Sequence, residues 1–531
     1  MMDRRNFLTG TFGATLLASL PAELLAATGS PPAQAKWDPG RVTHLLPTVS
    51  DTAMLIKASF APPLSAAPTL RIGAISVPGR QNDTAGECWQ FRAEGLAPGR
   101  TYAMTLTGAD GRTLCQPWEL ATFPSADAEA GHFRLLIFTC AGGHERLNFL
   151  PAAVRNRLLR RGLSFGPHAV VANGDHVYWD LLAPRASLNL GASEEGVRIS
   201  GKFDRSGLVF GENNETVLKR AAGPQITPIY GTDFRSTPVF FLQDDHDYFD
   251  NDEATDEIVT FPPSDFMVRL ARATQRLYYP EFLPDARRPK GLPWSTGGAD
   301  AGSESFGTLR YGRLAEINLY DVRRTATLAG PSAVFVDLEV EKWLRTRAAS
   351  ADVTHLVHVP SNPPGWSAGK WGEWYPDMLG ADKKLTTAIA KPYWQAGWLK
   401  QHDRLMQSLA AMKRRIPLVI SGDLHAVGLG RMLRAGAHDF QANPITTVLA
   451  GPISTGKTGW PSAFRGVGPS VPGHLDLREE IKPIEQHGFT IADFHPDRID
   501  LRFFKWDVQT QTPEAIDGLT PFHTSTLPRP V

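Results

Sequence analysis

The chain has 531 residues, in which 55 lysines and arginines balance 55 aspartates and glutamates. This length exceeds the usual size of one hydrophobic core, so two domains are expected. The balanced charge excludes a global field that would draw the protein onto nucleic acid or an anionic membrane, although it leaves a local basic patch open. Three cysteines are too few for a disulfide framework.

Residues 1–35 are typical of an export signal. Arg4 and Arg5 precede an uncharged stretch that is too short and too interrupted by glycine to span a membrane. The arginine pair and its flanking residues resemble the twin-arginine consensus, and residues 33–35 (Ala-Gln-Ala) supply a small-residue cleavage site. The resemblance implies the twin-arginine export machinery as a partner, a periplasmic or secreted destination, and no stable membrane span after cleavage.

Residues 36–124 combine short alternating segments with turn signals, which predicts a small β-sandwich. Residues 91–102 resemble the fibronectin type III pattern, in which a leucine and a tyrosine bracket a proline-glycine turn. Cys88 and Cys115 lie in this region, and they either pair after export or remain as buried thiols. Residues 125–131, which are small and acidic, have the composition of a linker.

Residues 132–531 show a different pattern, in which strands alternate with helices. A strand at 133–138, a helix at 147–161 and a strand at 168–173 form a βαβ unit, which implies parallel strands with a right-handed crossover. The fold class is therefore a layered α/β domain, preceded by the small sandwich. The same reading predicts a helix at 399–413 and strands at 238–243, 353–359, 418–421, 445–449 and 489–494.

Three further segments of this region carry weaker signals. Residues 499–506 alternate like an edge partner in a hairpin. Residues 183–228 and 285–305, which are rich in glycine with serine, charge or proline, are expected to be long surface insertions. Such insertions often set substrate choice when they reach the rim of a site.

Four predicted strands end in residues that bind metal ions. These ends are Thr139-Cys140, Gly174-Asp175, Asp244-Asp245-His246 and Gly422-Asp423-Leu424-His425. Open α/β sheets place their ligands at the carboxyl ends of the strands, and hard cations need oxygen donors held close together. A single aspartate in such a place is usually a turn or helix-cap residue, but four recurrences predict a metal centre. We therefore interpret the chain as a metal-dependent phosphoesterase.

These motifs, in this order, resemble the alkaline phosphatase D (PhoD-like) branch of the calcineurin-like metallophosphoesterase superfamily. The resemblance covers about residues 133–506. The matching segments are Thr139-Cys140, Gly174-Asp175-His176-Val177-Tyr178, Asp244-Asp245-His246-Asp247 with Asn251, Tyr320-Asp321-Val322-Arg323, and Ser421-Gly422-Asp423-Leu424-His425. Asp247 stands where the family usually has glutamate, a change that should preserve a supporting carboxylate.

The resemblance implies a dinuclear metal centre that hydrolyses phosphate esters with an activated water. Asp175 would bridge both metals, and Cys140, Tyr178 and His425 would complete the first site. A thiolate with a phenolate favours Fe³⁺ there. Asp245 and Asp423 would hold the second site, whose oxygen donors suit Ca²⁺, with Mg²⁺ or Mn²⁺ as alternatives. The expected partner is a phosphate-ester substrate, either a monoester or a diester, and no nucleic acid is expected.

The resemblance assigns further roles around this centre. His246 would act as general acid or steady the phosphoryl oxygens. Asn251 and Arg323 are candidates for phosphate contact; alternatively, Arg323 is a buried partner of Asp321. Cys140 has the alternative role of a buried structural thiol. The remaining donor near 353–362 stays open, because a core or surface role is expected for the histidines of that segment.

Two other functions were weighed. Residues 451–458 match the P-loop expression, but no helix follows and a proline removes one backbone N–H, so we expect a loop at the rim of the site. The alternative function is an exported binding protein with a degenerate phosphoesterase domain. Degeneration usually removes ligands, and the presence of Asp175, Asp245, His246, Asp423 and His425 argues against it.

Overall fold

The structure is a computed structural model that describes residues 37–179, 190–248, 262–285, 288, 303–456 and 459–530. The residues from Pro39 onward form one compact unit. The predicted export signal, Asn251 and most of the predicted insertion at 285–305 lie outside the described residues. Over the ranges that are described, no helix combines the length and the apolar character needed to cross a bilayer.

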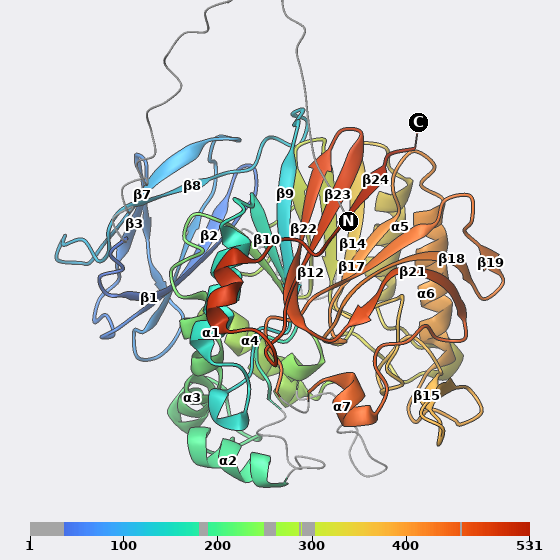
Figure 1. Cartoon of the computed structure of the whole chain (residues 1–531). Coiled ribbons are helices and arrows are strands. Elements are labelled where there is room, and N and C mark those ends of the chain that lie inside the picture. Colours follow the sequence, from blue (N-terminus) through green and yellow to red (C-terminus); the bar gives the residue numbers. More distant parts are fainter. Residues whose placement is uncertain are drawn as a thin grey trace, which may run out of the picture. The chain divides into compact units, whose positions relative to one another are not determined.

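The first eight strands form two four-stranded antiparallel sheets, with the orders β1-β2-β6-β5 and β4-β3-β7-β8 (Figure 1). In β7 the side chains are buried at every second position, as a strand with one face on a core requires. No disulfide joins Cys88 and Cys115, and both are buried. The strands are β1 (Val42–Val49), β2 (Met54–Phe60), β3 (Thr69–Ile72), β4 (Ile75–Pro78), β5 (Arg80–Gln81), β6 (Cys88–Ala93), β7 (Thr101–Thr107) and β8 (Trp118–Ala121).

A six-stranded sheet follows, with the order β11-β10-β9-β22-β23-β24. Strands β9, β10 and β11 are parallel, and α1 provides the crossover that the sequence predicted. The members are β9 (Phe133–Thr139), α1 (Ala152–Leu163), β10 (Ala169–Asn173), β11 (Val239–Leu242), β22 (His487–His495), β23 (Arg498–Trp506) and β24 (His523–Pro528). Helix α1 begins later than predicted, because Asn148 has a left-handed backbone (φ 66°) and Pro151 stands at the helix N-cap.

The largest sheet has eight strands, with the order β12-β13-β14-β17-β20-β18-β19 and β21 paired to β18. Strands β13, β14, β17 and β20 are parallel. The elements are β12 (Phe306–Tyr311), β13 (Ala315–Tyr320), α5 (Leu338–Ala349), β14 (His355–Pro360), α6 (Ala396–Ala410), β17 (Leu418–Ser421), β18 (Val427–Ala435), β19 (His438–Asp439), β20 (Ile445–Ala450) and β21 (Leu475–Ile484). Residues of α5 and α6, including Trp343 and Trp398, form a core cluster with this sheet.

The carboxyl ends of the parallel strands in both sheets meet. The backbone N–H of Thr139, at the end of β9, donates to the carbonyl of Gly451 after β20 (3.0 Å). The Asn173 amide, at the end of β10, donates to the carbonyl of Pro360 at the end of β14 (3.1 Å). Strand ends from two sheets therefore share one edge, which is where ligands of α/β folds bind.

Two sequence predictions about this region were wrong. Strand β23 is not an edge, because β24 pairs along its outer side. The segment 183–228 is not only a surface insertion: it contains α2 (Leu190–Ser200) and α3 (Glu212–Tyr230), and Leu218 and Ile226 of α3 are fully buried. Helix α3 contains glycine, charged residues and two prolines, and these residues interrupt the apolar periodicity by which a helix is predicted. The remaining α-helices among the described residues are α4 (Asp265–Tyr278) and α7 (Pro461–Arg465).

Candidate metal centre

The predicted ligands stand on a strained backbone at the strand ends. In the described part of the chain, seven non-glycine residues have positive φ, and four of them are Cys140 (50°), Asp175 (53°), Asp423 (66°) and His425 (46°). Each such residue costs on the order of 1–3 kcal/mol, and such strain gathers at functional sites. These turns, which follow β9, β10 and β17, point the side chains of three separate strand ends toward one place.

The first group consists of Cys140, Asp175, Tyr178 and His425. The Cys140 Sγ lies 3.2 Å from Asp175 Oδ2, and the Tyr178 hydroxyl lies 3.5 Å from the same oxygen. His425 Nε2 lies 3.1 Å from the Tyr178 hydroxyl and 3.9 Å from Asp175 Oδ2. The structure thus brings together all four ligands predicted for the first metal site.

The second group consists of Asp245 and Asp423 with two residues that the sequence did not single out. Lys370 places its ammonium 2.9 Å from Asp245 Oδ2 and in contact with Asp423 Oδ1. The Asn362 amide donates to Asp423 Oδ2 (2.8 Å). Asn362 follows β14, the segment in which the sequence analysis could not assign the remaining metal donor. Lys370 lies in a loop that does not follow a strand directly, so its place beside the carboxylates could not be predicted from the sequence.

Arg323 lies beside the second group, and its partner differs from the predicted alternative. Its Nε binds Asp244 Oδ1 (2.7 Å), and one terminal nitrogen lies 3.5–3.6 Å from Asp245 and Asp423. Asp321 accepts the backbone N–H groups of Arg323 (2.6 Å) and Arg324 (3.1 Å) and the Tyr248 hydroxyl (2.5 Å). Arg323 is therefore a buried partner of Asp244, a pairing that the sequence analysis did not predict. The proposed contact between Arg323 and phosphate stays a prediction.

Asp247 supports the turn that presents Asp175. Its carboxylate accepts the backbone N–H groups of Asp175 (3.2 Å), His176 (3.0 Å), Val177 (3.0 Å) and Asp244 (3.0 Å). A carboxylate at this position thus ties the ends of β10 and β11 together, which is the supporting role expected for it.

His246 borders both groups. A ring nitrogen of His246 and carboxylate oxygens of Asp175 and Asp245 lie within 4.8 Å of one another. Its ring lies against Tyr178, with centroids 4.2 Å apart. This position is compatible with contact to a substrate held by the cluster.

The loop that matches the P-loop expression, together with Gly459 just after it, contacts the imidazole of His425. The Thr455 hydroxyl lies 3.1 Å and the Gly459 carbonyl 2.6 Å from His425 Nδ1. With Nδ1 engaged, Nε2 faces Asp175 and Tyr178, which is the usual way in which a protein orients a metal-binding imidazole. Residues 457 and 458 of this motif lie outside the described residues.

The two histidines of β14 have core roles, as expected. His355 and His358 are fully buried; the first lies 2.6 Å from the carbonyl of His495, and the second 3.3 Å from the Tyr320 hydroxyl. Burial lowers the pKa of His355 to about 4 and of His358 to about 3. Neither takes part in the cluster.

The cluster concentrates negative charge in a buried place. Burial raises the pKa of Asp423 to about 6, although the charge of Lys370 acts against this rise. Burial and the neighbouring Asp175 raise the pKa values of Cys140 and Asp247 well above their ordinary values. For Asp245 the charges of Lys370 and Arg323 outweigh burial and lower the pKa. A bound cation would favour the ionised forms of these groups.

The donor set fits metal ions. Among the described residues, no group donates a hydrogen bond to the buried oxygens Asp175 Oδ1, Asp245 Oδ1 or Asn362 Oδ1, so these acceptors are available to a cation. The first group offers sulfur, nitrogen, phenol and carboxylate donors, whereas the second offers oxygen donors alone. The second group fits a metal ion only when the Lys370 ammonium moves aside, because that cation already lies between its carboxylates.

Comparison with known proteins supports this fold. No protein-family model matches the sequence, and no curated protein matches it. Among solved structures, PhoD covers 94% of this chain and 92% of its own, with 12% identity and a TM-score of 0.59. The purple acid phosphatase PPD1 from yellow lupin (Lupinus luteus) seeds covers 93% of this chain and 75% of its own, with 12% identity and a TM-score of 0.54.

These likenesses confirm the predicted layered α/β fold class and show that the chain has a fold like that of PhoD and of the purple acid phosphatase. The assignment of the first eight strands as a fibronectin type III-like domain, with its boundaries, stays a prediction.

Proposed function

We propose that this chain is an exported, metal-dependent phosphoesterase that hydrolyses phosphate esters. The observation that carries the proposal is the meeting of predicted ligands from separate strand ends. Metal-binding atoms of Cys140, Asp175 and His425 lie within 4.8 Å of one another, and so do those of the predicted ligands Asp245 and Asp423, together with Asp244. The PhoD-like fold supports the same reaction class.

The metals follow from the chemistry of the donors. Cys140 and Tyr178 are anionic ligands that favour Fe³⁺ in the first site. Asp245, Asn362 and Asp423 offer only oxygen, which suits Ca²⁺, Mg²⁺ or Mn²⁺. Asp175 belongs to the first group, its carboxylate also lies within 4.8 Å of that of Asp245 in the second, and it would bridge the two sites. A bound metal pair would supply a hydroxide at neutral pH and neutralise charge on the phosphoryl oxygens.

The chain's own residues then orient and protonate the substrate. Arg323, which is held by Asp244, keeps a fixed positive charge beside Asp245 and Asp423, where an anionic ester would lie. His246 is placed at the border of both groups, from which it would donate a proton to the leaving oxygen. No side chain needs to form a covalent bond to phosphorus.

The location belongs to the same proposal. The twin-arginine-like start of the sequence supports export to the periplasm or beyond, after folding and metal loading inside the cell.

The test uses the mature chain, purified without chelator. We expect iron and a second divalent metal by plasma mass spectrometry, together with turnover of nitrophenyl phosphate mono- or diesters. Asp175→Ala removes the bridging carboxylate, so metal content and turnover should both fall, the latter by at least about 10³-fold, since metal catalysis supplies several kcal/mol. The ratio of the two ester rates separates phosphatase from diesterase.

Asp127→Ala is the matched control, because Asp127 is an exposed aspartate outside the cluster. It should keep both metal and turnover. A folded wild-type chain that binds no metal even after reconstitution would contradict the proposal, and the exported binding protein would become the better interpretation.

A further inference from the structure

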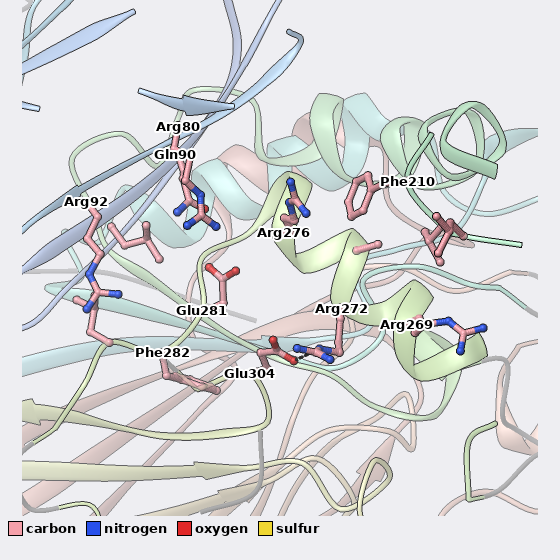
Figure 2. Close-up of a pocket in the computed structure, with 15 residues that line it drawn as sticks. Arg80, Gln90, Arg92, Phe210, Arg269, Arg272, Arg276, Glu281, Phe282 and Glu304 are labelled. Carbon is pink, nitrogen blue, oxygen red and sulfur yellow. Dashed lines mark hydrogen bonds and ion pairs between the residues drawn. The ribbon is translucent and has the colours of Figure 1, made fainter. Parts of the chain in front are cut away.

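A cavity lies away from the metal centre, between the β1-β2-β6-β5 sheet and helix α4. It has a volume of about 560 Å³, and none of the residues that line it belongs to the predicted ligand set. Figure 2 shows Arg80 and Arg92 from strands β5 and β6 on one side and Arg269, Arg272 and Arg276 from α4 on the other. The three arginines of α4 are spaced by three and four residues, so they share one helix face.

The two carboxylates of this cavity are already bound to cations. Glu281 pairs with the buried Lys57 (2.9 Å). Glu304 pairs with Arg272 (2.7 Å) and also with the buried Arg324 (2.8 Å), as the dashed line to Arg272 in Figure 2 indicates. Lys57 and Arg324, which do not line the cavity, thus contribute to balancing the two carboxylates, and the five arginines of the lining leave an excess of positive charge inside.

Three of the arginines lack an acidic partner. Across the described ranges, no carboxylate lies within ion-pair distance of Arg80, Arg269 or Arg276; Arg276 instead lies over the Phe210 ring, 4.5 Å from its centroid. Burial lowers the pKa of Arg276 and the charge of Arg80 lowers it further, although the more distant carboxylates of Glu215, Glu281 and Asp83 act against this. The like charges of Arg80 and Arg276 therefore lie near each other, and an anion bound between them would reduce their repulsion.

Apart from Gln90, the rest of the lining is apolar. Phe210, Phe282 and Leu283 form part of the wall, and Leu208 at its margin exposes 80% of its surface. The volume is in the usual range for sites of small organic ligands, about 300–1,000 Å³. Arginine forks match phosphate oxygens, whereas the apolar wall suits an aromatic body.

We propose that this cavity binds an organic phosphate of nucleotide size, with two or more phosphate groups on the arginines of β5 and α4 and an aromatic body on the apolar wall. The site is separate from the metal cluster, and its occupancy does not depend on hydrolysis.

The test is calorimetric titration of the metal-loaded full chain with the α,β-methylene analogue of adenosine diphosphate, with pyrophosphate and with adenosine. The analogue should bind, pyrophosphate should bind more weakly, and adenosine should not bind measurably. Arg80→Gln combined with Arg276→Gln should weaken the analogue by at least about tenfold, since each charge-assisted contact to phosphate is strong. Arg71→Gln is the matched control, because Arg71 is exposed on β3, outside the cavity; it should bind like wild type.

The outcomes separate this site from the metal centre. Asp175→Ala should retain binding of the analogue even though it loses turnover, so failure of the proposed hydrolysis leaves this prediction intact. If Asp175→Ala abolishes binding, the analogue occupies the metal centre and the proposal is wrong. Binding that persists in a folded Arg80→Gln/Arg276→Gln chain would overturn it, and so would equal affinity for adenosine or pyrophosphate. If the double variant does not fold, Arg269→Gln provides the same test, because Arg269 is exposed on α4; this variant should also bind the analogue more weakly than wild type.

Discussion

The placement of Lys370 is the residue-scale feature with the clearest consequence for metal binding. Its ammonium contacts Asp245 and Asp423, the two carboxylates predicted for the second metal. The turn that carries it is held by hydrogen bonds from the Ser367 hydroxyl and the Ala368 N–H to Glu373 (2.6 and 2.9 Å). Lys370 is therefore an ordered cation, and a second metal ion has to compete with it.

Lys370→Met should increase the affinity of the second site for Ca²⁺ or Mn²⁺. The ammonium and a dication a few ångströms apart repel each other by several kcal/mol at an effective dielectric near 20, so we expect a gain of at least about tenfold. Without metal, the variant should unfold more easily than wild type, because it leaves buried carboxylates without a partner. Calorimetric titration of the iron-loaded chain and denaturation with and without Ca²⁺ measure both effects.

Lys384→Met, at an exposed lysine, is the control and should leave both quantities unchanged. Equal second-site affinity in wild type and Lys370→Met would mean that the ammonium moves aside freely and does not compete.

The junctions between strands and loops are the elements that build the centre. Gly174 follows β10 with φ 85°, and a Cβ there would lie 2.6 Å from the Asp244 Cβ. Only glycine allows both the left-handed backbone and the close approach of the turn after β11. The close approach of the turns that carry Asp175 and Asp244 thus depends on the absence of a Cβ at Gly174.

Gly174→Ala should destabilise the protein by about 3 kcal/mol, from left-handed strain and overpacking together, and should also reduce metal content by displacing Asp244. Gly166→Ala is a matched control, since Gly166 has φ 66° but no atom within 4 Å of the added Cβ. It should cost only the strain of about 1–2 kcal/mol and keep the metal. Urea denaturation and metal analysis of both variants provide the measurement; equal losses of stability would show that contact with Asp244 is unimportant.

Buried neutral histidines set the response of the whole molecule to acid. His44 of β1 is fully buried, and burial lowers its pKa from 6.5 to about 3. Between these values the unfolded chain binds a proton that the folded chain does not, so the free energy of unfolding falls as the pH falls. Each such histidine adds a slope of about 1.4 kcal/mol per pH unit in this window and none above it.

We expect His44→Phe to reduce that slope by about 1.4 kcal/mol per pH unit between pH 6 and 4. Urea denaturation at a series of pH values measures the slope. His438→Phe, at a partly exposed histidine of β19, should leave it unchanged. An unaltered slope in His44→Phe would mean that His44 becomes protonated without unfolding.

Local patterns in the sequence were sufficient for much of the fold. Apolar runs ending in Cys140, Asp175, Asp245 and Asp423 predicted buried parallel strands, because strand periodicity and strand-end chemistry are properties of a few consecutive residues. The late start of α1 and the buried face of α3 were missed, since a left-handed residue and internal prolines override helical periodicity.

The sequence by itself therefore determined which ligands exist and at which strand ends they stand. Only the tertiary structure decided that Asn362 and Lys370 join them, that Arg323 pairs with Asp244, and that the arginines of α4 face Arg80 across a cavity. The physical reason is that these contacts join residues far apart in the chain. Burial and charge act on them through space, so no local pattern carries their signal.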